Sequence, residues 1–130
     1  MIYKFKVRTE TRRAMLDVTA EIQKTVEQSG VRSGLACIFT PHTTAGVAIN
    51  EHDDPDVARD ILATLERVVP REGDYRHYEG NSDSHIQATL AGCSQTVIIE
   101  DGRLQLGTWQ GVFFCEFDGP RQREVWVKIV

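Results

Sequence analysis

The first thirty residues change from the apolar spacing of a strand to that of a helix. Apolar and polar side chains alternate from Ile2 to Arg8, which predicts a strand with one buried face. A second, short strand is expected over Arg12 to Leu16. Three apolar residues then recur at the four-residue spacing of a helix: Val18, Ile22 and Val26. Asp17 or Thr19 is placed to cap the start of this helix, and Gly30 is placed to end it.

The middle of the chain predicts two further strands and the clearest helix. Residues 35–39 form a short continuous apolar run, which is typical of a strand buried on both faces. Residues 47–49 continue as another strand. Asp54 is a good N-cap, and Pro55 occupies the first helical position, where its missing N–H is not needed. The apolar stripe of this helix consists of Val57, Ile61, Leu65 and Val68. Pro70 ends the helix.

The last sixty residues predict a loop, a short helix and three strands. Residues 71–80 are polar and lack periodicity, so they form a loop. A helix follows over Ser82 to Ala91, with Ile86 and Leu90 facing inward. Three strands close the chain: Thr96–Glu100, Trp109–Phe117 and Glu124–Val130. Asp118-Gly119-Pro120 joins the last two as a turn. Consecutive strands pair in antiparallel fashion, so the expected class is α+β, a single domain over residues 1–130 with helices packed on a largely antiparallel sheet system.

Composition narrows the functional classes. The chain has 41% hydrophobic and 26% charged residues, as expected for a soluble globular protein, and its net charge is −4. The absence of a basic run argues against a nucleic-acid partner. No apolar run approaches the roughly 20 residues of a membrane span, and the N-terminus has no signal-peptide block, so we expect no membrane partner and a cytoplasmic location. Three cysteines without a CxxC pair fit reduced thiols.

Charged residues on apolar strands give the main chemical signal. Strand alternation places Gln110 and Glu116 on one face of the strand that also carries Trp109, which is expected to fill the core. Arg121 and Arg123 continue an apolar face of the following strand. Because a short turn joins the two strands, Glu116 should lie near both arginines. A simple ion pair and a ligand site explain this pattern equally well. In a ligand site, Glu116 would occupy one arginine while the other binds phosphate or carboxylate.

The histidines and one helix start give weaker signals. Free N–H groups at a helix start near Asn81 bind anions well, although capping by Asn81 or Ser82 is the simpler explanation. No two histidines have the i, i+4 spacing of a helical metal motif. Three of them follow strand ends or lie in loops and short helices, and could converge on zinc or a similar ion: His42, His77 and His85. His52 stands among acidic residues and is expected to be solvated and paired with an acid.

Motifs in a fixed order cover nearly the whole chain: Pro41-His42-Thr43-Thr44-Ala45, Asn50-Glu51, Asp54-Pro55, Tyr75-Arg76-His77, Ser84-His85, Leu106-Gly107-Thr108-Trp109-Gln110-Gly111, Glu116 and Arg121-x-Arg123. This pattern resembles the YjbQ family, also called UPF0047. Pro-His-Thr-Thr and Leu-Gly-Thr-Trp-Gln are its most specific parts. The resemblance implies an α+β domain containing a largely antiparallel β-sandwich with two to three helices packed on it, assembled as a homotrimer.

The resemblance also implies an activity. Some family members are described as secondary thiamine-phosphate synthases, which join a hydroxymethylpyrimidine diphosphate to a thiazole phosphate and release pyrophosphate. The partner would then be a small phosphorylated metabolite. The alternative is a metal- or phosphometabolite-binding module without catalysis.

Site roles follow from the motifs and the residue chemistry together. The expected catalytic residues are Glu51, His85, Gln110 and Glu116. The expected substrate-binding residues are Thr43, Asn50, Asn81, Arg121 and Arg123. The expected metal ligands are His42, His77 and His85. The expected cofactor is a divalent metal, either zinc on these histidines or Mg²⁺ on the diphosphate with help from Glu51 and Glu116.

Overall fold

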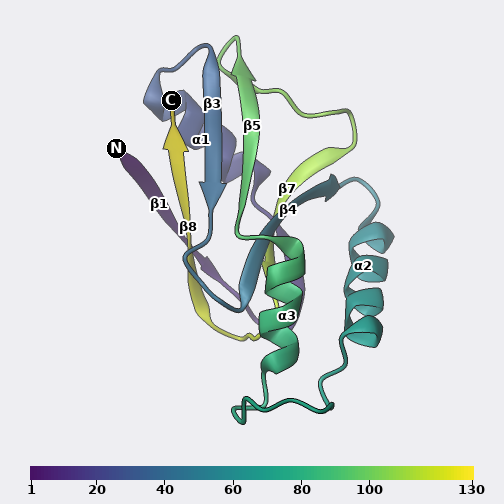
Figure 1. Ribbon diagram of the computed structural model, residues 1–130. Coiled ribbons are helices and arrows are strands. Elements are labelled where there is room, and N and C mark those ends of the chain that lie inside the picture. The colour runs from purple at the N-terminus through teal and green to yellow at the C-terminus, as the bar shows by residue number, and fades with distance from the viewer.

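The computed structural model describes all 130 residues and contains two antiparallel sheets and three helices (Figure 1). The strands are β1 (Ile2–Arg8), β2 (Ala14–Asp17), β3 (Gly34–Phe39), β4 (Ala45–Glu51), β5 (Ser94–Glu100), β6 (Arg103–Leu104), β7 (Gln110–Glu116) and β8 (Gln122–Ile129). The helices are α1 (Thr19–Ser29), α2 (Pro55–Val68) and α3 (Ser82–Ala91). The larger sheet has the order β1-β8-β3-β5-β6 and the smaller one β2-β7-β4. This architecture confirms the α+β class expected from the sequence.

The core has two parts, one on each face of β7. Val112 and Phe114 point toward the larger sheet and pack with Val125 and Val127 of β8. Phe113 and its same-face neighbours Cys115 and Phe117 form a second cluster under α2 and α3. Helix α1 packs on the inner face of the larger sheet, beside the smaller one. The alternation along β7 therefore divides its side chains as the sequence predicted, and both of its faces are buried.

The two closing strands do not pair with each other, contrary to the hairpin expected from the sequence. Strand β7 pairs with β2 and β4, whereas β8 pairs with β1 and β3. The turn between them therefore connects the two sheets (Figure 1). Each strand gains two neighbours in this way, and the apolar faces of both strands meet across the core. Glu116 and Arg123 still come together, but across the gap between the sheets.

Three apolar segments are more exposed than the sequence suggested. Leu35 is 43% exposed and Cys37 is also exposed, so β3 is buried on one face only. Trp109 is 57% exposed and does not fill the core. Helix α2 has no fully buried residue, and Val68 at its end is exposed. In each case, no second layer of this chain covers the outer side.

Helix α3 has the boundaries that the sequence predicted, but it faces the other way. Ile86 and Leu90 are exposed, whereas four other residues face inward: Asp83, Ser84, Gln87 and Ala88. The reason is electrostatic, because two arginines from the segment before β2 lie beneath the helix and require polar partners. The start of α2 and the end of α1 follow their local signals. The Asp54 side chain accepts from the Asp56 N–H, and Gly30 has a φ of 73° at the end of α1. None of the three helices is long and apolar enough to cross a membrane.

Candidate functional site

A buried ion pair between Glu116 and Arg123 joins the two sheets. Glu116 is 0% exposed and Arg123 4%. Glu116 Oε1 accepts from Arg123 Nε at 2.9 Å and from the Thr9 hydroxyl at 2.7 Å, and Oε2 accepts from the Asp118 N–H at 3.0 Å and from Arg123 Nη2. Arg123 Nη2 also donates to the Thr44 hydroxyl at 2.8 Å. Burial opposes the charge on Glu116, but these hydrogen bonds outweigh it and lower the pKa of the carboxyl.

Of the two arginines, Arg123 is the one that Glu116 binds. Arg123 is held by Glu116 and Thr44, and neither member of the pair is open to solvent. Within the chain, Glu116 and Arg123 therefore position the loop that carries Thr44 and do not face a cavity. Arg121 is the accessible one: its side chain is about half exposed and pairs with Asp118 at 3.1 Å.

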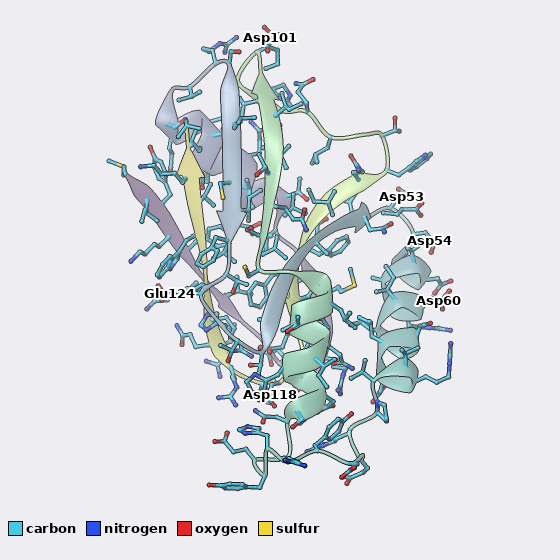
Figure 2. The ribbon with its side chains drawn as sticks, in the orientation of Figure 1. Asp53, Asp54, Asp60, Asp101, Asp118 and Glu124 are labelled. Carbon is cyan, nitrogen blue, oxygen red and sulfur yellow. The ribbon has the colours of Figure 1, made fainter.

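Asn81 is committed to Asp118 and does not cap α3. Its Nδ2 donates to Asp118 Oδ2 at 2.9 Å, and no side-chain cap bond forms at the helix start. Arg121 and Arg12 also donate to the Asp118 carboxylate. Burial works against the charge of Asp118, but the bond from Asn81 and the two arginines lower its pKa. Figure 2 shows Asp118 beside the first turns of α3.

A second set of buried charges fixes the start of α3 and was missed by the sequence analysis. The Asp83 carboxylate is fully buried and binds Arg12 at 3.2 Å and Arg13 at shorter range. Arg13 Nε also donates to Gln87 at 3.0 Å, and the Ser84 hydroxyl donates to the Phe117 carbonyl at 2.6 Å. The signal was the spacing of Asp83, Ser84 and Gln87, which places them on one side of a helix. The Asp83 charge is therefore compensated from beneath the helix.

An open groove runs along α3 and contains three of the expected histidines. It consists of two adjoining cavities of about 410 Å³ and about 490 Å³, and His85 lines both of them. Arg76, His77 and Ser82 line the first cavity, and His42 and Thr43 line the second. We call this feature the α3 groove. The rings of His77 and His85 are perpendicular, with centroids 5.4 Å apart.

His42 lies in the loop that connects β3 to β4. Its Nε2 accepts a hydrogen bond from the Glu124 backbone N–H at 2.9 Å. Burial lowers the pKa of His42, as does the charge of Arg123. Across the chain, no three His, Cys, Asp or Glu side chains are placed to hold a metal ion. The histidines therefore gather along one groove without forming a ligand set within the chain, and the metal site stays a prediction.

The remaining expected site residues lie at the other end of β4. Asn50 and Glu51 end this strand, and Glu51 pairs in register with Gln110. Glu51 lies six residue steps along the strand from Ala45 at the edge of the groove, a distance of roughly 20 Å at 3.3 Å per residue. Gln110 accepts from the Gly107 N–H at 2.8 Å and so shapes the turn before β7. Figure 2 shows Asp53 and Asp54 at this far end.

The same far end contains the fourth histidine. His52 Nδ1 lies 2.8 Å from Asp17 Oδ2, which confirms that this histidine is paired with an acid. The chain thus divides the expected residues between two places. His42, Thr43, His77 and His85 line the α3 groove, while Asn50, Glu51 and Gln110 lie about a strand length away.

Comparisons with known proteins agree over the whole chain. The family described as "UPF0047 protein YjbQ-like" matches residues 3–130. A UPF0047 protein of Methanocaldococcus jannaschii is 50% identical over 130 residues, covering 100% of this chain and 94% of that protein. The UPF0047 protein YugU of Bacillus subtilis is 47% identical, covering 100% of this chain and 99% of that protein.

Solved structures give the same result. An uncharacterised YjbQ/UPF0047 family protein of Clostridium acetobutylicum has a TM-score of 0.97 at 54% identity, covering 98% of this chain and 99% of that one. A conserved hypothetical protein of Thermus thermophilus has a TM-score of 0.92 at 41% identity, with coverage of 98% and 99%. Sequence and fold agree along the full length, so the chain belongs to the UPF0047 family of YjbQ-like proteins.

Proposed function

We propose that the α3 groove binds small phosphorylated metabolites and that the chain catalyses a thiamine-phosphate synthase reaction there. The observation that carries the proposal is the pair of adjoining cavities that share His85. Each has a volume within the range of roughly 300–1,000 Å³ found for small-molecule sites. Two cavities that share a lining residue suit a reaction that joins two phosphorylated substrates, because binding both along one helix removes much of the entropic barrier.

The first cavity has the donors that a phosphate requires. Arg76 lines it, as does Ser82 in the first turn of α3. The backbone N–H of Ser82 makes no hydrogen bond within the chain, and Ser82 is only partly buried, so this N–H is free for an anion at the positive end of the helix dipole. The Asp83 carboxylate does not oppose an anion strongly, because Arg12 and Arg13 neutralise it.

These donors suit the chemistry of the reaction. The bond between the pyrimidine methylene carbon and the diphosphate oxygen breaks, and pyrophosphate leaves with the electron pair. The thiazole nitrogen then forms the new C–N bond. Arg76 and the Ser82 N–H would stabilise the charge that grows on the leaving pyrophosphate. His42 and Thr43 would orient the second substrate, and the Glu116–Arg123 pair would hold their loop in place.

The groove suits Mg²⁺ better than zinc. Mg²⁺ is usually bound through substrate phosphates and one or two carboxylates, and Asp74 in the first cavity could supply one. Glu51 and Glu116 do not line the groove. A zinc site needs at least three protein ligands, and only the His77–His85 pair is close together. Mg²⁺ bound with the diphosphate is therefore the favoured cofactor, where it would add further charge neutralisation.

The test is turnover by protein purified without a histidine tag. Both phosphorylated substrates and Mg²⁺ are supplied, and thiamine phosphate is measured by chromatography. We expect product from the wild type and at least a tenfold loss in His85→Asn, on the scale of one lost substrate hydrogen bond. His52→Asn is the matched control, because His52 lies outside the groove. Calorimetric binding without product would favour the alternative, a phosphometabolite-binding module. The absence of both binding and product would refute the proposal.

We also propose that the chain assembles as a homotrimer. An exposed apolar group on the outer face of the larger sheet supports assembly: Ile2, Leu35, Cys37 and Ile98. Such a face usually contacts another protein surface. Light scattering should give about three times the 14.7 kDa of one chain, and a mass near 14.7 kDa would contradict the proposal.

A further inference from the structure

His42 replaces a missing strand partner. Strand β3 leaves β8 after the Phe39–Trp126 pair, so Glu124, two residues before Trp126, has no strand neighbour on that side. A buried backbone N–H without a partner is costly, and the imidazole of His42 supplies the acceptor. The Glu124 N–H thus holds the His42 ring in place. Glu124 itself is held on its other side, because β8 pairs with β1 there at Lys6.

This contact decides which nitrogen of His42 carries the proton. Nε2 accepts from the Glu124 N–H at 2.9 Å, so its lone pair is in use and it bears no hydrogen. A neutral imidazole has one N–H, which must then be on Nδ1. The charged form would direct a second N–H at the backbone N–H of Glu124. Among the surrounding charges, Arg123 and Arg121 oppose that form, while Glu116 and Glu124 favour it.

Nδ1 is the nitrogen left for a ligand. It makes no hydrogen bond within the chain, and it is not among the buried polar atoms that lack a partner, so it is open to solvent. The side chain lines the second cavity together with Thr43 and His85. Metal binding at Nδ1 requires a free lone pair, which this tautomer does not have.

We infer that His42 is held as the Nδ1–H tautomer by the Glu124 backbone and serves in the α3 groove as a neutral hydrogen-bond donor, not as a metal ligand. The tautomer rests on the sheet geometry alone, whereas the donor role rests on the proposed function. The ligand atom that meets His42 is an acceptor, such as an oxygen of a phosphate. This assignment replaces the metal role expected for His42 and separates it from His77 and His85.

The tautomer can be measured in the free protein. Long-range ¹H–¹⁵N spectra of uniformly labelled protein at neutral pH distinguish a protonated ring nitrogen from a bare one. We expect the His42 proton on Nδ1, with Nε2 bare, and no change on adding Zn²⁺. A proton on Nε2 would overturn the inference, and so would replacement of the Nδ1 proton by zinc. Both outcomes hold whether or not any phosphate compound binds.

The donor role is tested with the thiazole phosphate as the probe, because His42 lines the second cavity. His42→Gln keeps an acceptor near the Nε2 position for the Glu124 N–H, but its amide NH₂ is itself a donor, so His42→Leu, which has no donor, is measured beside it. Calorimetry should show binding of the thiazole phosphate weakened by roughly 10- to 100-fold in His42→Leu, the effect of losing one hydrogen bond to a charged group, and weakened less in His42→Gln. His52→Gln should bind as the wild type does. Equal affinity of His42→Leu and the wild type would overturn the donor role. An Nδ1–H tautomer in a wild type that binds no thiazole phosphate would uphold the tautomer and count against the proposed function.

Discussion

Replacing Glu116 by glutamine should destabilise the fold severely although the change is nearly isosteric. Each carboxylate oxygen accepts two hydrogen bonds, from Arg123 and Thr9 on one side and from Arg123 and Asp118 on the other. An amide has one acceptor only, so its NH₂ group must face two donors at one of these positions. The Arg123 charge is also left buried without a counter-charge.

The loss of unfolding free energy expected for Glu116→Gln can be estimated from this geometry. Removing one member of a buried, hydrogen-bonded ion pair costs roughly 3–5 kcal/mol. For a domain of this length, that corresponds to a fall of roughly 10–20 °C in melting temperature. Urea unfolding followed by circular dichroism measures the loss directly. It should come with weaker ligand binding, because Arg123 also holds Thr44 next to the His42 loop.

Two further variants isolate the mechanism. Glu10→Gln changes an exposed acid that forms no ion pair, and its free energy of unfolding should stay within about 0.5 kcal/mol of the wild type. Adding Arg123→Met to Glu116→Gln removes the uncompensated charge. The double variant should therefore lose less free energy of unfolding than the two single variants lose in sum. If Glu116→Gln unfolds within about 1 kcal/mol of the wild type, the buried pair does not stabilise the contact between the sheets as we reason.

Three other predictions test separate parts of the structure. The pKa of Glu116 is lowered from its usual 4.5, so its stabilising effect is present above that pH and is lost as the pH falls through the folded-state pKa. The stability gap between wild type and Glu116→Gln should therefore narrow in acid, and a gap that stays constant would contradict the assignment. Burial raises the pKa of the Cys115 thiol to about 12, whereas Cys37 and Cys93 are exposed. Ellman's reagent should label Cys93 quickly and Cys115 only on unfolding, and Cys37 should be fast only where its face is uncovered; three fast thiols including Cys115 would be inconsistent with this core. In Gly46→Ala, the new Cβ would lie 2.8 Å from the Gly92 carbonyl oxygen and 2.9 Å from Ala91 Cβ. Moving the end of α3 should cost roughly 1–3 kcal/mol in urea unfolding, and a neutral substitution would show that this contact relaxes freely.

The sequence by itself determined the local elements and the orientation of side chains within single strands. Helix starts and stops follow from short-range chemistry, as at Asp54 and Gly30, and need no knowledge of the rest of the chain. The division of β7 into two faces also follows from its period of two residues. The nearness of Glu116 and Arg123 was predictable for a similar reason, because a short turn keeps them close whichever strands pair.

Tertiary structure alone decided which strands pair, which way α3 faces and where the site residues lie. Strand pairing depends on how distant apolar faces are buried together, and no local period encodes that choice. Helix α3 turns its polar side inward because Arg12 and Arg13, some seventy residues earlier, lie beneath it. Likewise, the order of the motifs could not reveal that His42 and Glu51 occupy opposite ends of β4. Position along a chain becomes position in a site only when the sheets have packed.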